Sequence, residues 1–270
     1  MWLTANKISL NDGKTEIIHF HKPNNACPTD IKIKLNGKKL FPSKTIKYLG
    51  VYLDETLNGN AHCVELIKKL NRANGMLAKA RHFVPLNELK NIYHAIFSSH
   101  LMYGCQIWTQ KLLSVTEKIS ILQKNAVRIM TFSDFRAHSE PLFKQLDILK
   151  FTDNIVLQNC LFVFDYFKGN LPNSFDNNIF TRVDSSHSTE TRSADLGMLS
   201  IPRYQGTSYG LKSIYKSCIN SWNLLTKEIA KSIKKSKTKD TKIDLLNMFS
   251  RNRLKTTISK YLLSLYELDN

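Results

Sequence analysis

Residues 46–82 read IKYLGVYLDETLNGNAHCVELIKKLNRANGMLAKARH, and the period of the apolar residues changes within this stretch. Thr45–Leu53 is rich in β-branched and aromatic residues, which favours a strand. From about residue 60 the apolar residues recur at intervals of three and four, which predicts a helix over 62–82. We therefore expect an α+β protein that is mainly α, with a short α/β part over residues 1–57 followed by helices.

Two segments upstream of this stretch also favour strands. Thr15–His21 is rich in β-branched and aromatic residues, and Ile31–Leu35 alternates apolar and basic side chains. Asn36-Gly37 follows at once, a dipeptide that favours the tight turn of a hairpin leading into Lys38–Phe41. Asn11 and Asp12 are predicted to cap or turn the backbone before Thr15.

Three apolar patterns downstream predict a helical domain over residues 58–168. A broad stripe begins after Pro85 and ends before Gly104; it consists of Leu89, Ile92, Tyr93, Ile96, Phe97, His100 and Leu101. A narrower seam suited to helix-on-helix packing consists of Leu112, Val115, Ile119, Leu122, Ala126 and Ile129. Residues 155–167 are apolar on nearly every side, which is typical of a helix buried between others.

The composition changes again after residue 168. Residues 169–208 scatter Gly and Pro among Ser, Thr and Asn, and we interpret them as an irregular linker or loop. Residues 209–270 form a second helical region, with apolar stripes over 209–229 and 242–265. Between these stripes lies the basic segment 231–239, which we expect to be flexible.

The charge balance favours a polyanionic partner. Thirty-nine Lys and Arg against 22 Asp and Glu give a net charge of +17 and a pI near 9.6. Such an excess concentrates nucleic acid near the surface, although many basic proteins carry positive charge without a specific ligand.

The cysteines and the hydropathy indicate an intracellular protein, cytoplasmic or nuclear. Five widely spaced cysteines form no C-x-x-C pair and no set with zinc-ligand spacing, so we expect reduced thiols and no metal site. No run of about 18 apolar residues is present, and the N-terminus has no apolar signal region, so we expect no membrane association.

The predicted helix 62–82 carries the clearest candidate for nucleic-acid contact. At about 100° per residue, Lys68, Arg72 and Lys79 lie within about 40° of one another. Ile67, Leu70, Ala73 and Leu77 lie on the opposite side. Such a ridge of cations can follow a phosphate backbone, whereas the alternative is an ordinary solvated helix face.

Several segments carry a family resemblance. Asn6–Phe20 fits N-K-x-S-L-N-x-x-K-T-x-x-x-x-F, and Lys47–Asp54 fits K-Y-L-G-V-x-L-D. This pair resembles the last two palm blocks of a non-LTR (LINE-type, jockey-like) retrotransposon reverse transcriptase. Three later segments are similar to that family's downstream pattern: His100 to Trp108 (S-H-L-x-Y-G-x-x-x-W), Ile121–Ile129 (L-Q-x-x-A-x-R-I), and Thr191-Arg192 through Pro202 to Ser221-Trp222-Asn223 (T-R … P … S-W-N).

The resemblance implies a palm remnant over 1–57, with a primer-grip-like hairpin, and a thumb-like domain over 58–168. It implies RNA and DNA, as a template–primer duplex, as partners. Lys47, Tyr48 and Gly50 would contact nucleic acid at the primer grip, and Tyr48 could instead be half-buried. Gly50 could equally mark a β-bulge. The aromatic residues of His100 to Trp108 are expected in the core.

The resemblance also bears on catalysis. The family's aromatic-x-Asp-Asp turn binds Mg²⁺ and lies upstream of the first block, which here starts five residues after Met1; no Asp-Asp pair occurs in the 270 residues. We therefore expect no polymerase activity and no cofactor for this chain alone, although the complete family enzyme uses Mg²⁺. Lys14 lies where the family has a general acid, and here it would be vestigial.

Three interpretations remain open at this point. The chain could be a reverse-transcriptase fragment with a residual nucleic-acid-binding surface. It could be an enzyme whose catalytic half lies elsewhere. It could also be a host helical protein, for interaction or nucleic-acid binding, with no polymerase role.

Overall fold

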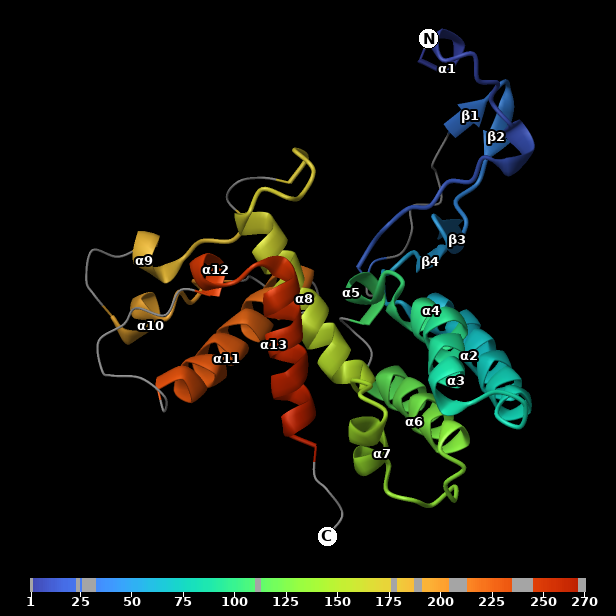
Figure 1. Ribbon diagram of the computed structural model, residues 1–270. Coiled ribbons are helices and arrows are strands. Elements are labelled where there is room, and N and C mark those ends of the chain that lie inside the picture. Colours follow the sequence, from blue (N-terminus) through green and yellow to red (C-terminus); the bar gives the residue numbers. More distant parts are fainter. Residues whose placement is uncertain are drawn as a thin grey trace. The chain divides into compact units, whose positions relative to one another are not determined.

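The computed structural model describes residues 2–22, 25, 33–109, 113–175, 179–186, 191–203, 213–234 and 245–266 (Figure 1). The chain divides into two compact units, Met1–Glu65 (unit 1) and Leu66–Asn270 (unit 2). The described strands all lie in unit 1, and the described part of unit 2 is helical with irregular connections. The predicted class, α+β and mainly α, is confirmed.

Unit 1 contains two short antiparallel hairpins. Its elements are α1 (Trp2–Ala5), the 3-10 helix η1 (Asp12–Lys14), β1 (Ile33–Leu35), β2 (Lys38–Leu40), β3 (Thr45–Tyr48) and β4 (Val51–Asp54). β1 pairs with β2 and β3 with β4. The predicted Asn36-Gly37 turn is confirmed. Thr45–Leu53 is two strands rather than one, because Leu49-Gly50 forms a second turn between them.

The expected strand over Thr15–His21 is an extended segment with a single bridge, between Ile17 and Pro42. Pro42 has no N–H to donate, so a regular ladder cannot grow through it. Asn11 caps η1 as predicted, since its side chain accepts a hydrogen bond from the Lys14 N–H at 3.2 Å.

Unit 2 is built from helices, the first of which begins in unit 1. They are α2 (Asn60–Ala80), α3 (Leu86–Tyr93), the π-helical turn η2 (His94–Ser98), α4 (Ser99–Met102), α5 (Cys105–Trp108), α6 (Leu113–Met130), α7 (Ser139–Gln145), α8 (Phe151–Phe167), α9 (Val183–Ser186), α10 (Arg192–Asp195), α11 (Ile214–Lys234), α12 (Leu245–Met248) and α13 (Arg251–Ser264).

α8 is the central helix of this unit. It packs against α5, α6, α11 and α13, and Figure 1 shows α11 and α13 beside it. Apolar side chains on several of its sides are buried, as its composition predicted. Asn159 is also buried within it, and its amide donates to Ser217 Oγ at 3.2 Å and to Ser221 Oγ at 3.1 Å. Because these bonds satisfy the amide, a polar residue is tolerated at the α8–α11 contact.

The predicted stripe from residue 89 to 101 forms one continuous helical run, α3–η2–α4. Leu89, Tyr93, Phe97 and Leu101 are buried at intervals of four, whereas His100 is exposed and does not belong to the buried face. The π turn winds less per residue than an α-helix, so the α-helical period places His100 wrongly.

The buried face of α6 also differs from the predicted seam. Ile119, Ala126 and Met130 are buried, but Leu122 is half-buried and Gln123 takes the buried position beside it. Gln123 Nε2 donates to Tyr93 Oη and to the Leu149 carbonyl, both at 3.0 Å, and Gln123 Oε1 accepts from the Phe151 N–H at 2.7 Å. Leu112 lies outside the described residues.

Trp222 and Asn223, inside α11, bond to the backbone of residues 197–199. The Asn223 amide exchanges two hydrogen bonds with the Leu199 backbone, and Trp222 Nε1 donates to the Gly197 carbonyl at 3.1 Å. The predicted 242–265 helix is broken into α12 and α13 at Ser250, which caps α13 through its side chain. The basic segment begins inside α11, which extends to Lys234, and its remainder, 235–239, lies outside the described residues.

Candidate nucleic-acid interface

The β3–β4 hairpin presents the first group of predicted residues. Register places Lys47 opposite Tyr52 and Tyr48 opposite Val51. Lys47 Nζ lies 5.6 Å from the centroid of the Tyr52 ring, while the Tyr48 side chain is 61% exposed. Tyr48 is therefore exposed rather than half-buried, and the tip carries an aromatic ring, with the Lys47 cation on the other face of the ribbon.

Gly50 has a local structural role that the sequence reading did not assign. It lies in the turn itself, with φ +86°, and Leu49 precedes it with φ +45°. Two successive left-handed residues define the turn that matches the twist of a two-residue hairpin. Gly50 is thus required by the turn conformation, and the β-bulge alternative is wrong.

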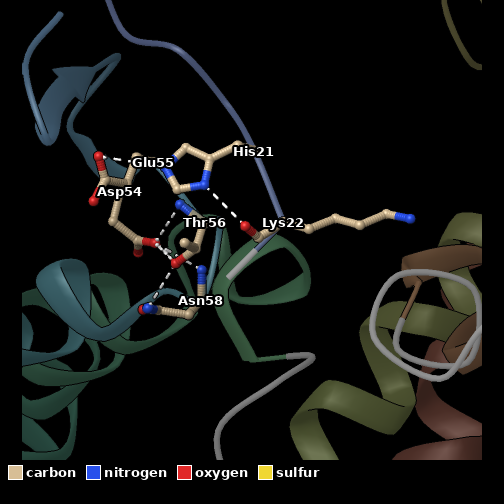
Figure 2. A network of polar contacts seen from close by, with 6 residues as sticks. All are labelled: His21, Lys22, Asp54, Glu55, Thr56 and Asn58. Atoms are coloured by element: carbon tan, nitrogen blue, oxygen red, sulfur yellow. Dashed lines mark hydrogen bonds and ion pairs between the residues drawn. The ribbon is translucent and has the colours of Figure 1, made fainter. Parts of the chain in front are cut away.

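A network of polar contacts at the base of this hairpin fixes the chain that leads into α2 (Figure 2). Asp54 Oδ1 accepts from the Thr56 N–H, the Thr56 hydroxyl and the Asn58 N–H, at 3.2, 2.9 and 2.9 Å. Asp54 Oδ2 accepts from the Gly59 N–H at 2.9 Å. The carboxylate is almost fully buried, so it organises the loop before α2.

His21 joins the same region of unit 1 (Figure 2). The backbone N–H of His21 donates to the Glu55 carbonyl at 3.0 Å, and the imidazole Nε2 lies 3.6 Å from Glu55 Oε2. The His19 ring stacks on the His21 ring with centroids 5.9 Å apart. These contacts tie the extended segment 15–22 to the end of β4.

The donor set does not fit the Mg²⁺ of a polymerase. Asp54 is engaged by the loop, and both oxygens of Asp12 accept from the Asn36 amide, at 2.9 and 2.8 Å. Within the described ranges, no group of three or more His, Cys, Asp or Glu side chains could hold a metal ion.

Lys14 lies at the end of η1, and its side chain is exposed. Its N–H donates to the Asn11 carbonyl at 3.1 Å. The backbone of Lys14 thus has a defined role in the turn.

The ridge on α2 is exposed over its whole length. Lys68, Arg72 and Lys79 are all exposed, while Leu70, Ala73 and Leu77 on the opposite side are fully buried. α2 also contains Lys69, and Glu65 is its single acidic residue. The helix therefore docks through one face and presents a row of cationic side chains on the other. We call Lys68, Arg72 and Lys79 the α2 ridge.

The segment around Gly104 is partly as expected. Trp108 is buried, stacks on Phe151 with centroids 5.7 Å apart, and donates from Nε1 to the Tyr103 carbonyl at 3.1 Å. Tyr103, expected in the core, is 55% exposed. α4 ends at Met102 with Tyr103 as its C-cap, and Gly104, with φ +60°, separates it from α5.

The described cysteines, Cys63, Cys105, Cys160 and Cys218, are free and buried. Burial raises the pKa of the Cys63 thiol to about 12 and that of the Cys105 thiol to about 11. Such thiols remain protonated at neutral pH and are weak nucleophiles and metal ligands. Cys27 lies outside the described residues.

The sequence reading missed two kinds of residue. Gln123 and Asn159 are buried polar hubs, and no periodicity rule selects a polar residue for the core. The other kind is a group of exposed aromatic residues at the ends of α2 and α6, namely Phe83, Phe132 and Phe135. The alternation of aromatic and basic residues in RHF (81–83) and FSDFR (132–136) is the signal that could have revealed them.

Comparison with known proteins supports the resemblance over part of the chain. The chain is 27% identical over 158 residues to the RNA-directed DNA polymerase from mobile element jockey of Drosophila funebris. It is 25% identical over 158 residues to the corresponding protein of Drosophila melanogaster. Each match covers 57% of this chain. The chain contains a region related to a LINE-type reverse transcriptase.

The matched region spans 17% of the length of each of these relatives. No family model matches the chain, and no solved structure matches it. Among the described helices, none combines the length and the hydrophobicity that crossing a bilayer requires.

Proposed function

We propose that the chain forms the end of the palm, the thumb and the downstream region of a non-LTR reverse transcriptase, and that it holds a template–primer duplex of RNA and DNA. The order of the sequence blocks and the distant similarity to the jockey polymerases support this assignment. The single observation that carries the binding role is the α2 ridge, an exposed row of cations opposite a fully buried face.

The chemistry of the ridge suits phosphates rather than bases. Lys68, Arg72 and Lys79 offer charge to a repeating polyanion, and such contacts fix position without reading sequence. The hairpin tip, with Lys47, Tyr48 and Gly50, would add a contact to the primer end, because an exposed ring can cover a sugar or base. The two surfaces lie in different units, and each is proposed on its own geometry.

This chain alone is not expected to extend a primer. Two-metal phosphoryl transfer needs paired acidic ligands, and the 270 residues contain no Asp-Asp pair. Lys14 then has no leaving group to protonate here. A primed RNA template with deoxynucleotides and Mg²⁺ or Mn²⁺ should remain unextended, and template-dependent extension that survives repurification would overturn this part of the proposal.

The test of the ridge is the salt dependence of duplex binding. Affinity for an RNA–DNA hybrid should fall steeply with salt, because each neutralised phosphate adds about 0.9 to the slope of log K against log salt for B-DNA, taken here as a guide for the hybrid. Changing Lys68, Arg72 and Lys79 together to Gln should flatten that slope by roughly 2 to 3. Gln is a good helix former, so α2 should persist.

A matched control removes the same charge elsewhere in unit 2. Lys227, Lys255 and Lys260 are exposed on α11 and α13, and their joint change to Gln should leave the slope nearly unchanged. If the control flattens the slope as much as the ridge variant does, binding follows total charge, and the ridge has no special role. Substituting the lysines of 231–239 tests the remaining basic segment in the same way.

A further inference from the structure

Exposed aromatic rings gather where α2 and α6 end. Phe83, Phe132 and Phe135 are 84%, 58% and 72% exposed. The two helix ends are joined, since Arg81 Nη1 donates to the Ile129 carbonyl at 3.3 Å and the His82 ring meets Phe132 edge-on with centroids 5.6 Å apart. We call Arg81, His82, Phe83, Phe132, Phe135 and Arg136 the α2–α6 cap.

Phe132 occupies a backbone position that favours glycine. Its φ is +56°, and its N–H bonds to the Ile129 carbonyl at 3.4 Å while the Ser133 N–H bonds to the Arg128 carbonyl at 3.1 Å. This is the pattern of a helix C-terminus whose left-handed residue is usually Gly or Asn. A bulky, largely exposed ring in that conformation gains little from burial and works against the local backbone preference, as residues at functional sites often do.

Cations lie against two of these rings. The guanidinium of Arg81 is 4.5 Å from the Phe132 centroid, and that of Arg136 is 5.1 Å from the Phe135 centroid. Residues 79–84 and 128–138 contain Lys79, Arg81, Arg128 and Arg136 and a single acid, Asp134. Asp134 Oδ1 accepts from the Arg136 N–H at 2.8 Å, so its charge is partly used within the loop.

Flat rings among cations suit one class of partner. A purely apolar protein segment would leave the guanidinium groups without counter-charge. A duplex would offer phosphates but would keep the faces of its bases stacked inside. A single strand offers both, because its base faces can stack on the rings while its phosphates meet the cations.

We propose that the α2–α6 cap binds single-stranded nucleic acid, with bases stacked on Phe83, Phe132 and Phe135 and phosphates beside Arg81 and Arg136. This site is distinct in chemistry from the α2 ridge, which recognises phosphates alone. Binding of nucleic acid by the α2–α6 cap should therefore depend on the presence of bases and tolerate changes of base sequence.

The experiment compares two probes with the full chain, an oligothymidylate of about 12 nucleotides and an abasic deoxyribose-phosphate oligomer of the same length and charge. The wild-type chain should bind the thymidylate at least about tenfold more tightly, since stacking adds affinity for each base. The joint change of Phe83→Ser, Phe132→Asn and Phe135→Ser should abolish this difference. Asn tolerates the left-handed backbone at 132, so the fold should be kept, which circular dichroism and a thermal melt would check.

A matched control changes three exposed apolar side chains elsewhere in unit 2, namely Tyr103→Ser, Ile107→Ser and Ile121→Ser. The control and the ridge variant should both keep the preference for the thymidylate, so failure of the ridge proposal would leave this one standing. Equal binding of both probes by the wild-type chain, or a cap variant that keeps the preference, would overturn the proposal. Self-association that the cap variant removes, without a preference for bases, would reassign the cap to contact between copies of the chain.

Discussion

The two units reach ordered structure by different means. Among the described side chains of unit 1, only Val51 and Cys63 are buried apolar residues, whereas unit 2 buries rows of them along α2, α3, α6, α8 and α11. Unit 1 relies on tight turns and on side chains such as Asp54 that bond to the backbone. Little of its sequence is therefore used for a core, which leaves the hairpin tip residues Tyr48 and Leu49 exposed.

Substitutions of one kind should therefore act differently in the two units. Burial contributes free energy in proportion to the area removed from water, while a turn contributes mainly through backbone conformation. Core truncations should thus dominate in unit 2, and conformational substitutions should be the sensitive probes of unit 1.

The largest expected effect comes from Phe97→Ala in the α3–η2–α4 run. Phe97 is fully buried, so its truncation should lower the free energy of unfolding by about 3–5 kcal/mol. Phe41→Ala, at a residue of unit 1 that is 70% exposed, should change it by less than about 0.5 kcal/mol. Denaturant unfolding followed through the buried Trp108 and Trp222 measures the first, and global circular dichroism measures both; comparable losses would refute the contrast.

A smaller loss is expected from Gln123→Ala on α6. The change leaves the Phe151 N–H and the Tyr93 hydroxyl without their partner in a buried site, at a cost of about 2–3 kcal/mol. Lys124→Ala, one residue further on an exposed face, is the control and should be nearly neutral.

The Tyr93 hydroxyl gives a second readout of the same site. Burial raises its pKa to about 12, and the Gln123 hydrogen bond opposes that shift. Without Gln123 the pKa should rise further, so spectrophotometric titration should show one tyrosine ionising at higher pH in the variant. An unchanged titration together with unchanged stability would show that Gln123 does not hold this contact.

The smallest effect uses one substitution in both units. Gly50→Ala places a β-carbon on a residue with φ +86° and should destabilise the β3–β4 hairpin by about 1 kcal/mol. Gly75→Ala lies in α2, where the new methyl group meets no atom within 4 Å, and should stabilise by about 0.5–1 kcal/mol. Amide hydrogen exchange in β3–β4 and in α2 measures the local stability change of each variant. Changes of the same sign in the two variants would contradict the predicted contrast.

Much of the architecture was predictable because local rules act strongly at particular residues. Asn36-Gly37 specified its hairpin, and the period of the apolar residues located the buried face of α2 at Leu70, Ala73 and Leu77. The exposed α2 ridge followed from the same period. The breaks at Leu49-Gly50 and at Ser250 were harder to predict from the sequence, since each lies inside a stretch whose composition favours a single element.

The candidate site was less accessible to sequence reasoning. Gln123 and Asn159 are core residues only because partners far along the chain satisfy them, and that pairing has no local signal. The α2–α6 cap depends on two helix ends that meet in space although 48 residues separate Arg81 from Ile129. Exposure of an aromatic ring is likewise a tertiary property, as Tyr103 and Trp108 show within one motif.

The π turn at His94–Ser98 has a consequence for comparing this chain with its relatives. Leu89, Tyr93, Phe97 and Leu101 stay on one buried face although each is four residues from the next, and in an uninterrupted α-helix that spacing would drift by about 120° over the run. A relative with one residue fewer in this turn would place the same four side chains at intervals of four, three and four, the ordinary spacing of a packed helix. An alignment with such a relative would need a single-residue gap within His94–Ser98.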